Sequence, residues 1–136
     1  MSTQNTSKSL NISLWVSQGL LAALYLMAGS SKVFKSIDEL SQMLPWVTDV
    51  SSNLVRFIGV SELLGGLGLI LPSALRIQPR LTPLAAYGLA LVQIMAAIFH
   101  ISRGETPMIA MNLLLVAIAL FIAWGRTKKA PIEARA

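Results

Sequence analysis

Two titratable side chains stand out because each lies within or at the end of a long uncharged stretch. Glu62 is the only charged residue between positions 57 and 75, and His100, the only histidine, closes an uncharged run that begins at position 81. At membrane depth a charged side chain costs at least about 2.5–3.5 kcal/mol unless it is paired, protonated or hydrated. Glu62 and His100 are therefore the candidate catalytic groups, as an acid–base pair for proton transfer. The alternative for Glu62 is a structural ion pair with Lys32, Arg56 or Arg103.

Four long apolar stretches must position these groups. The chain has 136 residues, of which 54% are hydrophobic and only 12% are charged. A helix needs roughly 20 apolar residues to cross a bilayer, whereas a soluble bundle would carry a charged face along each helix. The sequence therefore predicts an all-α fold, a transmembrane four-helix bundle with an up-down-up-down path. The predicted helices span about residues 12–31, 54–71, 84–101 and 107–124.

The segments outside these helices divide the chain into three parts. Residues 1–10 are expected to be a flexible N-terminal tail, residues 11–125 the single transmembrane domain, and residues 126–136 a basic, disordered C-terminal tail. A helix start at Ser36 predicts a short helix at the membrane interface, interrupted by Pro45. Pro72 is expected to end the second transmembrane helix.

The distribution of lysine and arginine predicts the orientation. The side that would hold both termini carries Lys8, Arg76, Arg80, Arg126, Lys128, Lys129 and Arg135, and the other side carries Lys32, Lys35, Arg56 and Arg103. The cytoplasmic side of a membrane protein is usually the more positive one. We therefore expect an integral protein of a bacterial inner (cell) membrane with both termini in the cytoplasm.

Each predicted helix carries one stripe of small and polar residues at helical spacing. In a membrane bundle such stripes face inward, while large aliphatic side chains face lipid. On the up-down path most of the polar residues fall in the non-cytoplasmic half, which predicts a polar pocket there. The predicted ligand-binding residues are Lys32, Glu62, Gln93, His100, Arg103 and Asn112. Arg103 and Glu105 are also predicted to form a structural turn at the mouth of the pocket.

The same residues have structural interpretations. His100 could be an interfacial residue bonded to a neighbour, and Gln93 and Asn112 could hydrogen-bond one helix to another. The glycines at positions 65, 66 and 68 could pack neighbouring helices or dock another membrane protein. Because the chain has no cysteine and a single histidine, no metal site and no intrinsic cofactor is expected within one protomer.

Four segments together resemble the DoxX-like family of small membrane proteins. They are AGSSK at 28–32, RFIGVSELLGGLGLILP at 56–72, LTPLAA at 81–86 and HISRGE at 100–105. The resemblance implies a membrane four-helix bundle. Its functional implications are heterogeneous, because relatives are linked to quinone-dependent sulfur oxidation, oxidative-stress complexes or chaperoning of membrane partners. The matching positions are Lys32, Glu62, His100, Arg103 and Glu105.

Three functional hypotheses follow. The first is a pocket for a quinone, a lipid or another lipophilic small molecule, in a subunit of a membrane redox system. The second is a structural or assembly subunit without ligand chemistry, and the third is a stand-alone membrane isomerase or hydrolase that uses Glu62 and His100. The expected partners are membrane lipid, a lipophilic small molecule, and a membrane-protein partner or a second copy of the chain. Nucleic acid is not expected, because the basic residues lie at the ends of apolar stretches.

Overall fold

The structure is a computed structural model, and it describes residues 7–135. The described residues form helices and no strand, which confirms the all-α prediction. Four of the helices are long and apolar enough to cross a membrane. The elements are α1 (Lys8–Phe34), α2 (Ile37–Met43), the 3₁₀ turn η2 (Pro45–Thr48), α3 (Ser52–Leu75), α4 (Leu81–Ser102), α5 (Thr106–Trp124) and the π-helical turn η3 (Gly125–Lys129).

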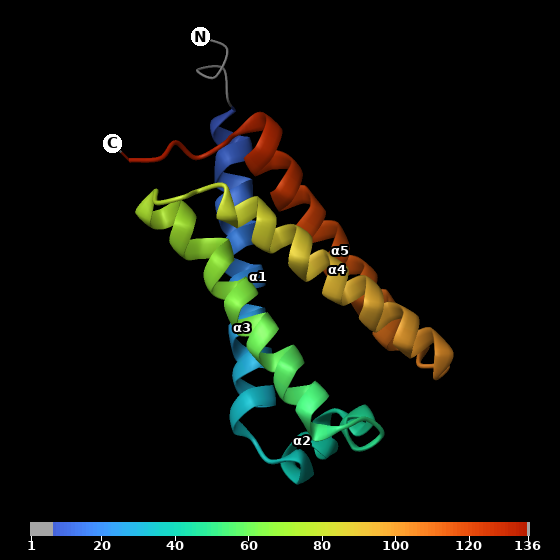
Figure 1. Cartoon of the computed structure of the whole chain (residues 1–136). Coiled ribbons are helices and arrows are strands. Elements are labelled where there is room, and N and C mark those ends of the chain that lie inside the picture. The colour runs from blue at the N-terminus through green and yellow to red at the C-terminus, as the bar shows by residue number, and fades with distance from the viewer. Residues whose placement is uncertain (1–6, 136) are drawn as a thin grey trace.

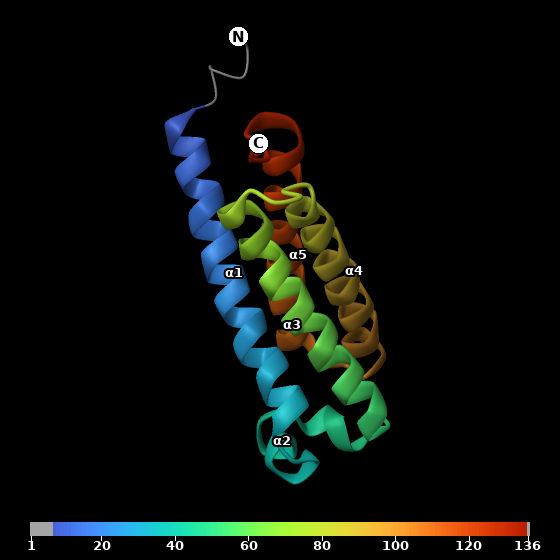
Figure 2. The ribbon, with the colours of Figure 1, turned by 60° about the vertical axis from the view of Figure 1, so that its left-hand side comes forward.

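The four long helices alternate in direction, and both described chain ends lie at the same end of the bundle (Figure 1). We call this the terminal end. The opposite end carries α2 and η2, which belong to a cap segment that we define as residues 36–51. Helix α1 packs mainly on α3, and α4 packs mainly on α5. The two pairs diverge toward the capped end in Figure 1 and run alongside each other in Figure 2.

Hydroxyl side chains mark the starts of three helices. The Ser7 hydroxyl accepts a hydrogen bond from the Leu10 amide, so α1 begins at Lys8, inside the expected N-terminal tail. Ser36 and Glu39 form a reciprocal capping box at α2. The Ser51 hydroxyl caps α3 by accepting from the Leu54 amide. Such caps satisfy amide groups that have no partner within the helix. The remainder of the expected tail, residues 1–6, lies outside the described residues.

Pro72 does not end its helix, so that prediction is wrong. Helix α3 continues to Leu75, and its C-cap residue, Arg76, has a left-handed backbone with φ of 58°. Proline at position 72 has no N–H to donate to the carbonyl of Gly68. The Thr82 hydroxyl of α4 donates to that carbonyl instead, at 3.0 Å. A neighbouring helix thus replaces the lost backbone bond, which is how proline is tolerated inside membrane helices.

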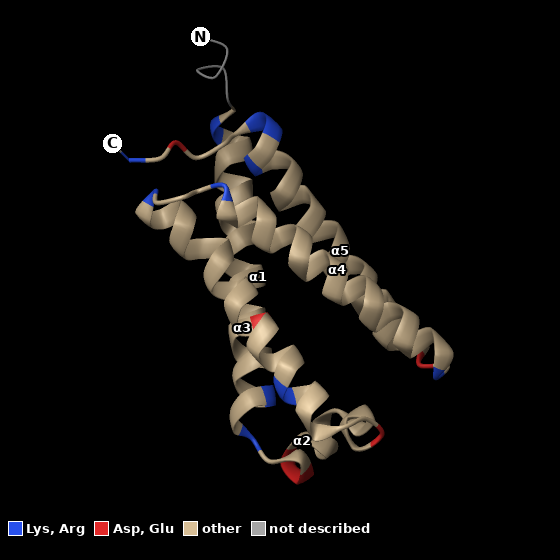
Figure 3. Cartoon of the chain, in the orientation of Figure 1, with Lys and Arg blue, Asp and Glu red and all other residues tan. Residues whose placement is uncertain are grey.

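The surface of the bundle is apolar, whereas polar side chains lie inside. Leu20, Leu64 and Ile98 are each more than 60% exposed, whereas Gln18 and Thr82 are completely buried. The lysine and arginine residues gather toward the two ends and leave the middle of the helices almost free of charge (Figure 3). This arrangement is the one that a lipid environment requires.

The glycines of α3 face the neighbouring helices of the same chain. A Cβ atom on Gly66 would lie 3.0 Å from Leu26 of α1, and one on Gly68 would lie 2.8 Å from Ala85 of α4. Gly29 of α1 and Gly59 of α3 bring these two helices into direct backbone contact. Of the two interpretations of the glycines, the contacts therefore favour close packing within the bundle.

Candidate functional site

Lys32 and Glu62 form a buried ion pair between α1 and α3. The Lys32 Nζ atom donates to Glu62 Oε1 at 2.9 Å, and the two residues are only 8% and 5% exposed. Of the three cations considered for Glu62, the structure selects Lys32. Arg56 instead donates to the backbone carbonyls of Lys32 and Lys35, and so closes the end of α1.

A second buried pair joins α4 to α5. The Asn112 side-chain amide donates to Gln93 Oε1 at 2.7 Å. The Tyr25 hydroxyl of α1 lies near the side chains of Gln93 and Glu62. It makes no hydrogen bond of normal geometry. Tyr25 therefore lies between the two pairs. Lys32, Glu62, Tyr25, Gln93 and Asn112 are called the inner polar group below.

Within residues 7–135, two atoms of the inner polar group have no hydrogen-bond partner of normal geometry. They are the Tyr25 hydroxyl and Asn112 Oδ1, and both are buried. Buried polar atoms are nearly always satisfied, because an unsatisfied one costs about 1–3 kcal/mol. The hydroxyl can donate a hydrogen bond, and the amide oxygen can accept one.

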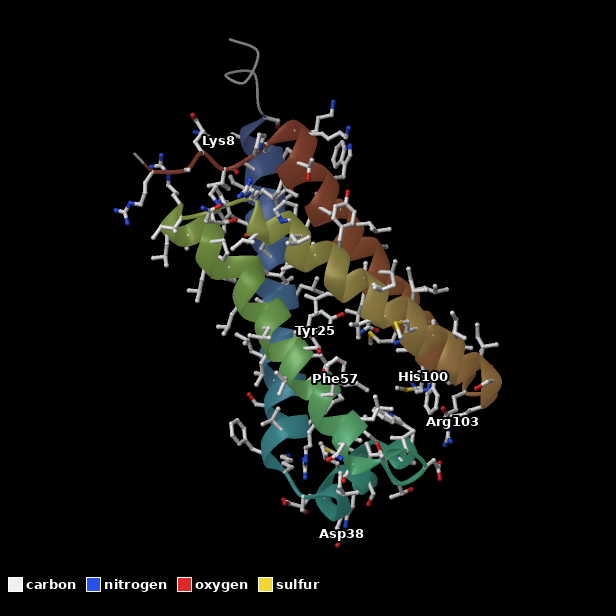
Figure 4. The ribbon with its side chains drawn as sticks, viewed as in Figure 1. Lys8, Tyr25, Asp38, Phe57, His100 and Arg103 are labelled. Atoms are coloured by element: carbon white, nitrogen blue, oxygen red, sulfur yellow. The ribbon has the colours of Figure 1, made fainter. Side chains whose placement is uncertain are left out.

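An outer polar group, formed by His100, Arg103 and Glu105, lies nearer the capped end. Figure 4 shows His100 there, in the last turn of α4, and Arg103, which follows the end of that helix. His100 Nδ1 lies 2.7 Å from Glu105 Oε1. Arg103 donates to the same oxygen at 3.0 Å and pairs with Asp49 of the cap segment at 2.7 Å. The hydrogen bond with His100, and then the one with Arg103, lowers the pKa of the Glu105 carboxyl. The hydrogen bonds with Glu105 and then Asp49 raise the pKa of Arg103.

The cap segment is anchored on α4 by aromatic contacts as well. The Trp46 ring packs edge-on against Phe99 and His100, with centroids 5.9 and 6.4 Å away. Behind Trp46, a small apolar cluster of Leu40, Val47 and Val55 holds the segment together. The cap segment therefore covers the end of the bundle where the outer polar group lies.

The predicted site residues fall into these two groups rather than into one. Lys32, Glu62, Gln93 and Asn112 belong to the inner group, and His100, Arg103 and Glu105 belong to the outer group. Among residues 7–135 no hydrogen bond or ion pair joins Glu62 to His100. Each of the two is instead bonded to another side chain, Glu62 to Lys32 and His100 to Glu105.

The predicted site lacked Tyr25 of the inner group, and it lacked Asp49 and Trp46, which contact the outer group. Tyr25 lies on the polar stripe of its helix, and its position seven residues before Lys32 places both on one face. Asp49 and Trp46 come from the cap segment, where spacing along the chain gives no signal of a contact with α4. Only the folded structure brings the cap segment to Arg103 and His100.

Two hollows on the structure lie away from both polar groups. One lies between α3 and α4 and is lined largely by small and aliphatic residues, among them Gly65, Gly68 and Gly88. The other lies at the terminal end beside Arg80 and Arg126. Within residues 7–135 no group of three or more histidine, aspartate or glutamate side chains is placed to hold a metal ion.

Comparison with known proteins identifies the family. Residues 16–122 match the model of the DoxX-like family, as the resemblance of the four sequence segments predicted. Neither the curated proteins nor the solved structures compared with the chain include a match. The family match spans all four long helices, and those helices have the length and composition of membrane spans. This chain is therefore a four-helix membrane protein of the DoxX-like family.

Proposed function

We propose that the inner polar group binds a quinone or a similar lipophilic carbonyl compound, in a subunit of a membrane redox system. The observation that carries the proposal is the pair of unpartnered buried atoms, the Tyr25 hydroxyl and Asn112 Oδ1. They supply one donor and one acceptor, on opposite helix pairs. Ligand sites in helical bundles commonly lie between facing helices and use a few polar groups to orient an apolar molecule.

The two atoms match the two oxidation states of a quinone. The Tyr25 hydroxyl can donate to a quinone carbonyl, and Asn112 Oδ1 can accept from the hydroxyl of the reduced form. Reduction of a quinone takes up two electrons and two protons. In this proposal the electrons come from a redox cofactor in a partner subunit. The buried Lys32–Glu62 pair, close to Tyr25, is the group that carries protons to the ligand.

The proposed setting is a bacterial cell membrane with both termini in the cytoplasm. An even number of spans places both termini on one side. The terminal end carries Lys8, Arg76, Arg80, Arg126, Lys128 and Lys129, which supports this orientation by the positive-inside rule. The inner polar group would then lie in the non-cytoplasmic half.

The test compares two tyrosines of the same chain. Tyr25→Phe removes the buried donor, whereas Tyr87→Phe removes a hydroxyl from a residue that is 52% exposed and serves as the matched control. Each variant is purified in nanodiscs with added ubiquinone or menaquinone, and bound quinone is measured by native mass spectrometry. Loss of one hydrogen bond predicts about two- to tenfold weaker binding for Tyr25→Phe and no change for Tyr87→Phe.

A second variant and a second readout complete the test. Asn112→Ala should weaken binding of the reduced quinol more than that of the quinone, because only the quinol donates to Asn112 Oδ1. Quinone binding that is equal in all three variants, or absent from the wild-type protein, would refute the proposal. A partner complex that survives these substitutions while no quinone binds would instead support the structural role considered above.

A further inference from the structure

Arg126 is a buried cation at the terminal end of the bundle. It is 4% exposed and lies in the η3 turn that follows α5. Its guanidinium donates to Gln18 Oε1 at 2.7 Å, to Asn11 Oδ1 at 2.8 Å and to the Ala130 carbonyl at 2.8 Å. The guanidinium also lies over the Trp15 ring, 5.2 Å from the centroid. All of these partners are electrically neutral.

The charge of Arg126 has no counter-ion among residues 7–135. None of the ion pairs of this part of the chain includes Arg126, and its Nη2 atom is buried without any hydrogen-bond partner. A buried charge is normally paired with an opposite charge, because neutral dipoles replace lost hydration only in part. The positive charge of Arg126 thus remains uncompensated among residues 7–135 and would attract an anion bound nearby.

Arg126 lines a hollow of about 550 Å³ at this end. Arg80, the residue before α4, also lines it and is exposed. No acidic side chain is among the lining residues. The remaining walls include Pro83, Pro131 and Ile132, which are apolar.

The C-terminal segment forms one wall of the hollow. We expected residues 126–136 to be disordered, but residues 130–135 lie across the turn between α3 and α4 (Figure 1). The Arg76 guanidinium donates to the Glu133 carbonyl at 2.8 Å, and the Arg135 amide donates to the Arg76 carbonyl at 2.8 Å. Backbone bonds and the buried Arg126 hold the segment in place, which charge composition alone does not reveal. Ala136 lies outside the described residues.

We propose that this hollow binds the phosphate group of an anionic phospholipid. Two arginines line the hollow, and guanidinium groups suit phosphate oxygens. The charge of one of them, Arg126, has no counter-ion within residues 7–135. The hollow lies beside the ends of α3 and α4, where lipid headgroups surround a membrane bundle, and its apolar walls suit the adjoining glycerol and acyl carbons. Basic pockets at the ends of membrane helices are known binding sites for anionic headgroups. A soluble phosphate ester would present the same chemistry, so the test separates the two sources.

The test removes one charge from the hollow and one from outside it. Arg126→Gln would also break the bonds to Gln18 and Asn11, so the informative variant is Arg80→Gln, which alters an exposed side chain. Lys128→Gln is the matched control, because Lys128 is exposed and does not line the hollow. The purified proteins are titrated in a non-ionic detergent with short-chain phosphatidylglycerol, short-chain phosphatidylcholine and inorganic phosphate, and binding is followed by native mass spectrometry and thermal stability.

The wild-type protein should bind one phosphatidylglycerol at least tenfold more tightly than phosphatidylcholine. Arg80→Gln should reduce this affinity about tenfold, the usual effect of losing one charge-assisted hydrogen bond. Lys128→Gln should change the affinity less than about twofold, as expected for an exposed charge without direct contact. Competition by millimolar inorganic phosphate would assign the site to the phosphate group itself, and its absence would assign it to the whole lipid headgroup. Equal binding of the two lipids, or equal effects of the two substitutions, would overturn the proposal.

Discussion

The Lys32 ammonium and the Glu62 carboxylate lie 2.9 Å apart, between two helices that touch through glycine. Gly29 and Gly59 allow the backbones of α1 and α3 to approach closely, and the ion pair lies beside this contact. An ionisable pair in a membrane bundle is tolerated when both members are bonded to each other. Removal of one member should therefore cost more than removal of both.

Lys32→Met should destabilise the protein by about 3–5 kcal/mol, because Glu62 would remain buried without its partner. The double variant Lys32→Met/Glu62→Leu should recover most of this loss, since it leaves no unpaired charge. Unfolding in mixed detergent micelles measures both. A Lys32→Met protein as stable as the wild type would show that the pair does not stabilise the fold.

Thr82→Val should destabilise the protein by about 1–3 kcal/mol, because the Gly68 carbonyl loses the donor that replaces the missing amide of Pro72. Adding Pro72→Ala should reduce this loss, since alanine restores an amide that can bond to Gly68. Thr106→Val, at an exposed threonine, is the control. Equal losses from Thr82→Val with and without Pro72→Ala would contradict this account of the proline.

Gly29→Ala should separate α1 from α3. The added Cβ atom would lie 2.7 Å from the Gly59 carbonyl oxygen and 2.9 Å from the Leu63 amide nitrogen. Both are backbone atoms, so no side-chain rotation can relieve the clash. We expect a loss of about 1–3 kcal/mol. Gly19→Ala on the same helix is the matched control, because its Cβ would meet nothing within 4 Å. A comparable loss from both substitutions would point to helix flexibility rather than packing.

The contacts of Glu105 should make the capped end sensitive to acid. The pKa of Glu105 is lowered in the folded protein, mainly by the hydrogen bond with His100, so the folded state binds this proton less tightly than the unfolded chain does. The resulting stabilisation is fully present above the unfolded pKa of about 4.3 and is lost as the pH falls through the lower folded value. The difference in Tm between the wild type and Glu105→Gln should therefore shrink as the pH falls from about 6 to about 3.

Glu133→Gln is the control for this prediction, because Glu133 accepts the hydrogen bond from Arg76 through its backbone carbonyl, which the substitution leaves in place. Its difference from the wild type should not follow the pattern of Glu105→Gln. A difference for Glu105→Gln that is constant over this pH range would show that the bonds to His100 and Arg103 contribute nothing to folding.

The sequence by itself determined the class of the fold and which face of each helix turns inward. Long uncharged stretches dictate membrane helices, because lipid excludes unpaired charge and unbonded backbone. Helical spacing then placed Lys32, Glu62, Gln93, His100 and Asn112 on inward stripes, and all five are buried. Periodicity reports the direction of a side chain around its own helix, and it therefore predicted which side chains face the inside of the bundle.

The tertiary structure decided which of these side chains bond to one another. Glu62 bonds Lys32 rather than Arg56 or Arg103, since the glycine contact brings the ends of α1 and α3 together. The attachment of Asp49 to Arg103 and the continuation of α3 past Pro72 depend on contacts with other segments. The burial of Arg126 depends on Gln18 and Asn11, more than one hundred positions earlier in the chain. Sequence spacing does not encode such long-range pairings, because they follow from how complete helices pack.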